Sequence, residues 1–556
     1  MKHRVARHFE DMLQCSIPAF EGLFPAEHDD IIRVLLFRLA EWHALAKLRL
    51  HTDGSLQLLD HALKALAAQL RKFERITCNA FQTRELPSET AARRRRQEMN
   101  VTSSRIQDPG ARPKTFNLLT YKFHALGDYV NTIKMFGTTD SYTTQIGESA
   151  HRLIKKFYGS TNKKDIAKQL ARQERRHTHT RRQHQAENPL EVGLDKNGLD
   201  GSLQEPPRHA TAQSTVNTTN LVKLLSDNQD DPAVKDFVFK LRDHLLTRLH
   251  GYEYDGDERH FSDAEHNDLE LENLNRIPVP KRLRVAYTTY DIRRDQDSMS
   301  PGNGCAVITL SREDTSGAHP FWYARVLRIF QIPIRHVGPN SKDQSLRTME
   351  VLWVRWLGVE PDYHWGFKEA RLPKVGFIPD SDENAFGFLD PSLVIRGCHL
   401  IPVFAGGCTD TLMKPGPSLG RLAGETDDWS SFYVNIFADR DMFARFAGIG
   451  IGHEAQFNNM KPADMAGALT ENEGDGVSSE EDTMDYDSSD FDADDAAKSR
   501  PVTEVEVEVE DQDQDTDENE NPSDSQSNNE NCDNDDGRDG DEDSDEDSDE
   551  DLGFSF

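Results

Sequence analysis

Apolar residues at three- and four-residue steps predict helices in the first part of the chain. One stripe is formed by Ile31, Leu35, Leu39, Trp42 and Ala46. A second stripe follows, formed by Leu56, Leu59, Leu63, Leu66, Leu70 and Phe73. Each stripe marks one face of a helix, with Asp53 placed to cap the second one, so we expect the two helices to pack on each other. A dimerising coiled coil is the alternative, although the pattern is shorter than about three heptads.

The same spacing continues after a polar stretch. Leu119, Phe123, Leu126, Val130 and Ile133 predict a helix, which a Gly137–Asp140 turn separates from another helix beginning near residue 145. Residues 187–232 are rich in Asn, Gln, Thr, Asp and Pro and have the composition of a linker. A short helix is expected from about residue 233 to 249.

From residue 282 the pattern changes to short segments rich in β-branched and aromatic residues. Gly, Pro and Asp separate these segments, which cover residues 285–290, 305–310, 322–334, 350–357 and 393–404. They predict a compact antiparallel barrel or sandwich. Residues 428–446 are expected to return to helix and to pack back through Phe432, Ile436, Phe443 and Phe446.

These patterns predict an α+β chain with several regions. We expect a helical region, a pair of helices that carries basic residues, a linker, a short helix with a connector, a barrel-like region ending in a helix, and a disordered tail. Their bounds are 1–100, 114–186, 187–232, 233–280, 281–453 and 454–556.

Charge is distributed very unevenly along the chain. The net charge is −32, but residues 471–556 hold 37 acidic residues against Lys498, Arg500 and Arg538, which is −34. The remaining 62 basic and 60 acidic residues give residues 1–470 a net charge of +2. The acidity therefore belongs to the tail, whose composition predicts disorder.

The strongest electrostatic signal before the tail is basic. Between residues 151 and 186, eleven Lys or Arg stand against Asp165 and Glu174, a local +9. The eleven are Arg152, Lys155, Lys156, Lys163, Lys164, Lys168, Arg172, Arg175, Arg176, Arg181 and Arg182. Such a stripe displaces counterions from a phosphate backbone without regard to base sequence. A merely solvated helix is the alternative. The sequence leaves three roles open for Arg93 to Arg96: a nuclear import signal, a phosphate contact, or a solvated helix face.

Other classes of chemistry find little support. The six cysteines are scattered without a CxxC pair, which gives neither a zinc ribbon nor a disulfide framework. We find no apolar run long enough to span a membrane and no signal-peptide core, so we expect an intracellular protein that does not bind membranes. Phosphate-binding GxxxxGK[ST], HExxH and GxSxG motifs are absent from the sequence.

Three stretches carry a family resemblance. They run from Phe9 to His51, from Phe116 to Arg176 (with GTTDSYTTQIGE at 137–148), and from Tyr287 through Phe388-Leu389-Asp390-Pro391 to Phe443. Together they resemble the C-terminal portion of Plavaka-type transposases of mushroom-forming fungi, which are related to KDZ and CACTA-like DNA transposons. The likeness covers most of residues 8–453.

The resemblance implies an RNase H-like fold in which two Asp and one Glu hold two divalent metal ions, Mg or Mn. Glu148 matches the final Glu of the family. The alternative is that Glu148 only stabilises the positive, N-terminal end of a helix. The chain starts inside the helical insertion of that family, so the strands with both catalytic Asp are expected to be missing. Asp128 and Asp140 do not replace them. No cofactor is therefore expected to bind this chain alone.

The β-rich region has a weaker resemblance to bromo-adjacent homology barrels of chromatin proteins. It rests on Trp322–Phe330, Leu352–Leu357 and Ile395–Leu400. The resemblance implies binding to protein or nucleosome surfaces. Aromatic residues available for a peptide or methyl-lysine pocket are Trp322, Tyr323, Trp353, Trp356 and Trp365, but core packing is the alternative reading of most of them.

The leading hypothesis is a transposon-derived, noncatalytic transposase segment that binds DNA through the basic stripe, in the nucleus or otherwise the cytoplasm. The alternative is a chromatin or protein adaptor that acts through the barrel and uses the acidic tail to engage basic proteins such as histones. A third possibility is an active enzyme whose first half is supplied by another chain.

Overall fold

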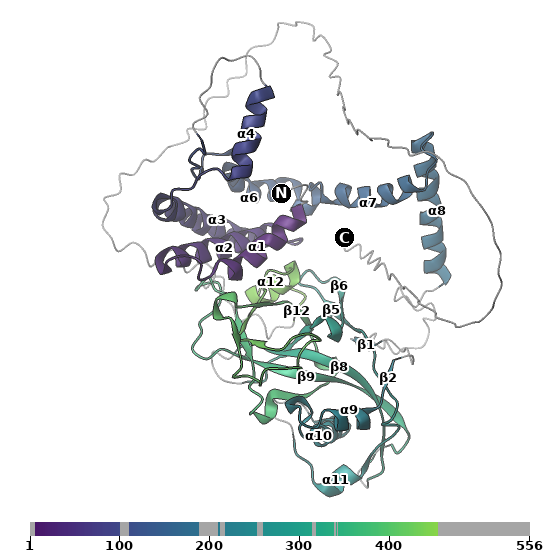
Figure 1. The fold of residues 1–556 in the computed structure, drawn as a ribbon. Coiled ribbons are helices and arrows are strands. Elements are labelled where there is room, and N and C mark those ends of the chain that lie inside the picture. The colour runs from purple at the N-terminus through teal and green to yellow at the C-terminus, as the bar shows by residue number, and fades with distance from the viewer. Residues whose placement is uncertain are drawn as a thin grey trace, which may run out of the picture. The chain divides into compact units, whose positions relative to one another are not determined.

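The chain folds into helices and antiparallel sheets, an α+β architecture (Figure 1). The structure is a computed structural model and describes residues 6–99, 110–187, 209–211, 217–252, 259–313, 319–338, 341 and 343–453. The acidic tail, for which the sequence predicts disorder, lies outside the described residues.

The N-terminal region is helical, as its apolar stripes predict. Its elements are α1 (Ala6–Phe20), α2 (Ala26–Ala46), α3 (Asp53–Lys72), the π-helical turn η1 (Phe73–Cys78) and α4 (Pro87–Met99). The stripes of α2 and α3 meet in one hydrophobic core, where Leu45 and Leu66 are fully buried. The cap of α3 differs from the prediction by one residue: Thr52, not Asp53, accepts a hydrogen bond from Ser55 N at 3.1 Å. Asp53 is instead the first helical residue.

The helix expected over 116–133 is broken into three short pieces. They are α5 (Tyr121–His124), the 3₁₀ turn η2 (Ala125–Asp128) and α6 (Tyr129–Phe136). Gly127 lies in the middle piece, and glycine costs about 1 kcal/mol in a helix interior relative to alanine. Of the predicted stripe, Ile133 is buried whereas Leu119 is 83% exposed. The turn η3 (Thr139–Ser141) follows, in the predicted place.

The range with linker composition is partly folded. From residue 217 it forms β2 (Thr218–Thr219), α9 (Leu221–Asp227) and η4 (Pro232–Val234), and Leu221 is buried. Composition missed this because a few apolar residues anchor the segment. The next helix, α10 (Phe237–His250), agrees with the short helix expected here. Its Phe237 ring packs edge-on against Trp353 and Phe388, with ring centroids 5.2 and 4.9 Å away.

The β region forms a nine-stranded sheet and smaller sheets, all antiparallel where the structure describes their pairing. The large sheet has the order β12-β7-β8-β9-β10-β16-β13, with β11 also on β9 and β3 on β8. Its strands are β3 (Leu269–Leu271), β7 (Ala306–Leu310), β8 (Phe321–His336), β9 (Arg347–Val359), β10 (Lys374–Phe377), β11 (Phe386–Leu389), β12 (Arg396–Cys398), β13 (Leu400–Pro402) and β16 (Phe432–Val434). A second sheet has the order β1-β5-β6, from β1 (His209–Thr211), β5 (Leu283–Thr288) and β6 (Arg294–Met299). Two-stranded pairs complete the region: β2 with β4 (Ile277–Pro278), and β14 (Cys408–Thr409) with β15 (Asp428–Trp429); the short helix α11 (Asp263–Asn267) precedes β3.

The two strands at the ends of the large sheet are neighbours in the chain. His399 alone separates β12, which pairs with β7, from β13, which pairs with β16. The chain therefore changes pairing partner at this residue, and the peptide His399 carbonyl accepts a hydrogen bond from Asn435 N at 2.9 Å.

The prediction of a helix over 428–446 is wrong for the first half of this range. Residues 428–434 form β15 and β16, and only α12 (Arg440–Ala447) is helical. Phe432, Tyr433 and Val434 are the aromatic and β-branched types that fit a strand, and they pair with β10 and β13. Asp439 then starts α12 by accepting a hydrogen bond from Met442 N at 2.8 Å.

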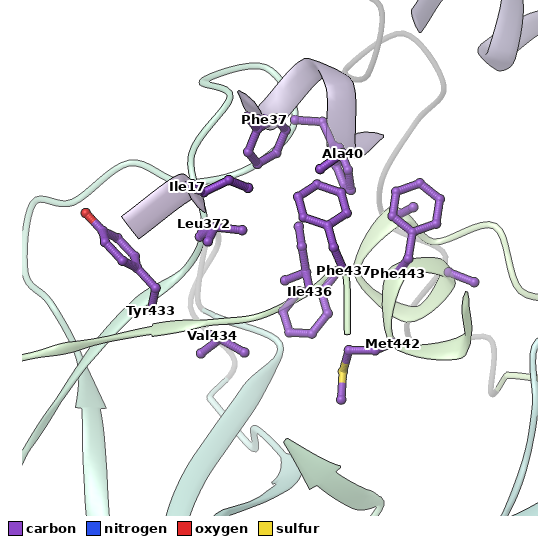
Figure 2. Close-up of a cluster of buried hydrophobic side chains, with 14 of the residues drawn as sticks. Ile17, Phe37, Ala40, Leu372, Tyr433, Val434, Ile436, Phe437, Met442 and Phe443 are labelled. Carbon is purple, nitrogen blue, oxygen red and sulfur yellow. The ribbon is translucent and has the colours of Figure 1, made fainter. Parts of the chain in front are cut away.

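The N-terminal helices and the end of the β region share one hydrophobic core (Figure 2). Phe37 of α2 and Phe437 lie edge to face with ring centroids 5.2 Å apart, and Phe37 is fully buried. Ile17 of α1 packs in the same cluster. At its margin the Tyr433 hydroxyl donates to the Glu21 carboxylate at 2.9 Å. Segments more than 350 residues apart in sequence are thus buried together in one contiguous hydrophobic core.

Candidate nucleic-acid interface

The predicted basic stripe lies on a pair of packed helices. They are α7 (Gln145–Gly159) and α8 (Ile166–Glu187). Phe157 of α7 is buried, and its ring centroid lies 5.7 Å from that of His177 on α8. Ile166, Leu170 and Gln173 are also half-buried. Together with His177 they recur at steps of four, three and four residues, so they form the face of α8 that packs.

A row of basic residues occupies the other side of α8. Lys168, Arg172, Arg175, His179 and Arg182 also follow at steps of four and three residues, and all five are exposed. With about 3.6 residues per turn, this stripe falls about half a turn away from the packing face. Arg176 is exposed beside it. The charge therefore points to solvent, where an extended anion can reach it.

Further basic residues flank this face. Lys155 and Lys156 are exposed on α7, and Lys163 and Lys164 are exposed in the turn between the helices. Arg152 and Arg181 belong to α7 and α8, but their side chains are outside the described part of the structure.

Most of these charges have no acidic partner in the part of the chain that the structure describes. Among the residues that the structure describes, the following form no ion pair: Lys155, Lys163, Lys164, Lys168, Arg172, Arg175, Arg176 and Arg182. The nearby Glu174 instead accepts a hydrogen bond from the Thr178 hydroxyl at 2.8 Å. Arg93 differs, because its guanidinium forms an ion pair with Glu85 at 2.9 Å.

Among the described residues, the carboxylates considered for metal binding form no group that could hold an ion. Glu148 lies in the first turn of α7, and its side chain is not among those described. Asp140 forms a bidentate pair with Arg440, with both N–O distances 2.7 Å. Burial alone would raise the pKa of Asp140, but the hydrogen bonds and charge of Arg440, with Arg49, lower it below its usual range. Asp140 is thus a structural anion, and among the described residues no group of three His, Cys, Asp or Glu is placed to hold a metal ion.

The aromatic candidates of the β region do not form a common pocket. Tyr323, Trp353 and Trp356 are all buried, and each belongs to a different hydrophobic cluster. Trp322 is half-buried and donates its Nε1–H to Glu313 at 3.1 Å. Trp365 packs against the His319 ring, with centroids 4.8 Å apart. The three buried rings serve as core residues, which is the alternative that the sequence left open.

Sequence reasoning missed a set of buried ion pairs near the end of the β region. Arg396 of β12 reaches Asp297, Asp439 and Asp441 at 3.2, 2.7 and 2.9 Å. The guanidinium also lies 4.4 Å from the centre of the Tyr287 ring. The sequence did show an arginine inside a predicted strand segment. It could not show the three aspartates that pair with this arginine, because they are distant in sequence.

Within the parts of the chain that are described, no helix is both long and apolar enough to cross a membrane. Comparisons of the chain with family models, with curated proteins and with solved structures give no match.

Proposed function

We propose that this chain is a transposase-derived, noncatalytic segment that binds DNA through the basic face of α8. The observation that carries the proposal is the exposed row Lys168, Arg172, Arg175, His179 and Arg182, which lies opposite the face that packs on α7. A surface helix normally places polar side chains of either charge opposite its packing face, whereas every residue of this row is basic.

The dimensions of this face suit a duplex. At 1.5 Å per residue, the row from Lys168 to Arg182 is about 21 Å long, which spans about six base-pair steps. A helix with its side chains is about as wide as the major groove. Contacts to phosphates fix position without reading sequence, so the binding is nonspecific and depends on salt. The proposed location is the nucleus, where DNA is the available polyanion.

The absence of catalysis is part of the proposal. Glu148 is the position that resembles the third catalytic acid, and the first two have no counterpart in the resembling stretches. Of the nearby acids, Asp140 is engaged by Arg440, which supports a structural role for it. Mg or Mn is accordingly assigned to the complete parent enzyme and not to this chain.

For the fold, we propose that α7 and α8 correspond to the last helices of an RNase H-like core. We further propose that the large sheet is a closed barrel of the bromo-adjacent homology kind. The support for closure is that β12 and β13, at opposite ends of the strand order, are joined through His399 alone.

The test is a salt titration of duplex binding by the full chain. Removing two phosphate contacts with Arg172→Gln and Arg175→Gln should weaken binding and reduce the slope of log K against log salt by about 2. A matched variant, Arg284→Gln with Arg294→Gln, removes two exposed arginines from β5 and β6 and should leave the slope unchanged. Fluorescence anisotropy with a labelled random duplex measures both.

Two results would contradict the proposal. One is a salt slope near zero for the unmodified chain, since that would mean that no phosphate is neutralised. The other is an equal loss in both variant pairs, which would make the effect one of overall charge and not of the α8 face.

A further inference from the structure

A cleft separate from the α8 face lies between the N-terminal helices and the β region. Its cavity volume is about 420 Å³, which falls within the roughly 300 to 1,000 Å³ of small-molecule sites. One wall comes from α1, α2 and the residues just after α2. The other comes from β5, β6, β12 and the start of α12.

The two walls are held at a fixed separation by contacts at the cleft. Arg49 N donates to the Tyr290 hydroxyl at 2.6 Å, and Asn435 Nδ2 donates to Gln14 Oε1 at 3.0 Å. The shared hydrophobic core, with Phe37 on Phe437, lies next to them. A ligand therefore meets a preformed site and need not order the walls on binding.

The walls carry opposite charge. On the helical wall, Arg7, Lys47 and Arg49 stand against Glu10, a formal charge of +2. On the β wall, five aspartates stand against Arg396 and Arg440, a formal charge of −3. The aspartates are Asp291, Asp295, Asp297, Asp439 and Asp441.

Most of these charged groups are paired within the described part of the protein, whereas Asp295 and Arg7 are not. Asp295 forms no ion pair among the described residues, and its only hydrogen bond there is from Gln296 N at 2.8 Å. On the opposite wall, Arg7 likewise has no ion pair within the described chain. Arg49 pairs with Asp140 over 3.5 Å, a distance at which its buried Nε forms no hydrogen bond among the described residues. Arg7 and Asp295 thus line opposite walls of the cleft, each without an ion pair among the described residues.

Two neighbours of Asp295 strengthen its wall as a cation site. Asp439, the most exposed of the aspartates that bind Arg396, keeps 40% of its side chain accessible. Tyr287 donates its hydroxyl to Asp297 at 3.3 Å, and burial raises the pKa of this phenol well above its usual range. The phenol therefore stays a neutral hydrogen-bond donor in the strand position opposite Asp295.

We infer that this cleft binds a small dipolar molecule with a carboxylate at one end and a guanidinium or ammonium at the other. The carboxylate contacts Arg7 and the Arg49 guanidinium, and the cation contacts Asp295. A free amino acid with a basic side chain and a peptide ending in Arg or Lys both have this chemistry. A ligand with one charge alone leaves one wall unpaired, so both ends contribute to specificity.

Calorimetric titration of the full chain tests the inference with three matched probes. N-acetyl-arginine carries both charges, its amide lacks the carboxylate, and N-acetyl-citrulline is a nearly isosteric molecule without the cation. N-acetyl-arginine should bind at least about tenfold more tightly than either of the others, since each lost charged hydrogen bond amounts to about one factor of ten or more. Acetyl-alanyl-alanyl-arginine distinguishes the two sources of ligand. If the site takes a peptide terminus, this probe binds more tightly than N-acetyl-arginine. If the site takes a free amino acid, the added residues make it bind more weakly.

Variants locate the site. Asp295→Asn should weaken N-acetyl-arginine binding about tenfold and leave the weak binding of its citrulline analogue unchanged. Asp60→Asn, which removes an exposed carboxylate from α3, should change neither. Equal binding of all three probes, no binding of N-acetyl-arginine at millimolar concentration, or no effect of Asp295→Asn would each overturn the inference. DNA binding by α8 is independent of these outcomes.

Discussion

Asp441 shows how individual residues stabilise the end of the β region. Its carboxylate accepts hydrogen bonds from the Tyr290 backbone at 2.7 Å, from Arg445 at 2.8 Å and from His453 at 2.7 Å. Burial alone would raise its pKa, but the hydrogen bond from His453 and the charges of Arg445 and Arg396 lower the pKa to about 2. The folded state therefore stabilises the ionised form of Asp441 more than the unfolded chain does.

This pKa predicts how stability depends on pH. An unfolded Asp has a pKa near 3.9, so the contribution of Asp441 is fully present above about pH 4 and is lost as the pH falls through about 2. Asp441→Asn should lower the free energy of unfolding at pH 5, and this difference from the unmodified chain should shrink by about 2 kcal/mol towards pH 2. Urea denaturation at several pH values measures it.

The matched control is Asp60→Asn on α3, whose carboxylate is 49% exposed and pairs with Lys64. Exposed pairs contribute about 0 to 1 kcal/mol, so this variant should show a small difference at every pH. If the difference in free energy of unfolding between Asp441→Asn and the unmodified chain stays constant from pH 5 to pH 2, the ionised form of Asp441 is not the stabilising one.

At the scale of elements, the hydrophobic pattern predicted best where one element buries one face. The stripes of α2 and α3 and the strands β5, β7, β8 and β9 lie close to their expected bounds. It failed over 428–434, where alternation is too short to separate a strand from a helix turn, and over 116–133, where Gly127 interrupts the stripe. Over 428–434, pairing with β10 and β13, which the local sequence does not contain, decided the outcome.

The contact between Phe37 and Phe437 predicts coupling between distant elements. Phe37→Ala and Phe437→Ala should each lower the free energy of unfolding by about 3 to 5 kcal/mol, because each leaves a cavity in the core. The double variant should cost less than the sum by about 0.5 to 1.5 kcal/mol, the usual value for an edge-to-face pair. A double-mutant cycle with chemical denaturation measures this.

Phe9→Ala on α1 serves as the control, since this ring is 54% exposed and its loss should change stability by no more than about 0.5 kcal/mol. Strict additivity of the two core substitutions would mean that the helices and the β region do not stabilise each other through these rings.

At the scale of the whole molecule, the candidate sites were predictable to different degrees. The basic stripe of α8 could be predicted because its residues lie close together in sequence and follow helical spacing. The cleft could not, since Arg7, Arg49 and Asp295 are brought together only by tertiary contacts. The sequence left the role of the aromatic residues open for a similar reason: composition identifies rings but not whether Tyr323 and Trp353 point into a pocket or a core.

The proposed DNA binding makes the acidic segment a competitor. Its charge of −34 is tethered to a stripe of +9, so it lowers the affinity of the stripe for phosphates at low salt. A chain ending at residue 470 should bind duplex DNA more tightly than the full chain, and the difference should disappear as salt rises. Anisotropy titrations at low and high salt measure this.

A full-length chain in which the acids of residues 471–556 are replaced by Asn and Gln is the matched control. It should bind as tightly as the shortened chain if charge is the cause. Equal affinity of all three proteins would leave the segment without an electrostatic role in DNA binding.

The connection through His399 also has a consequence for the order of folding. The segment 396–402 pairs with β7 on one side and with β16 on the other, and these partners lie far apart in the chain. It can complete both ladders only after the chain on either side has been brought into place, so its hydrogen bonds depend on contacts of long sequence separation. Such contacts slow folding, and the newly made chain exposes β7 and β16 as open sheet edges until this segment arrives. The interval before that step is when the protein is most vulnerable to aggregation.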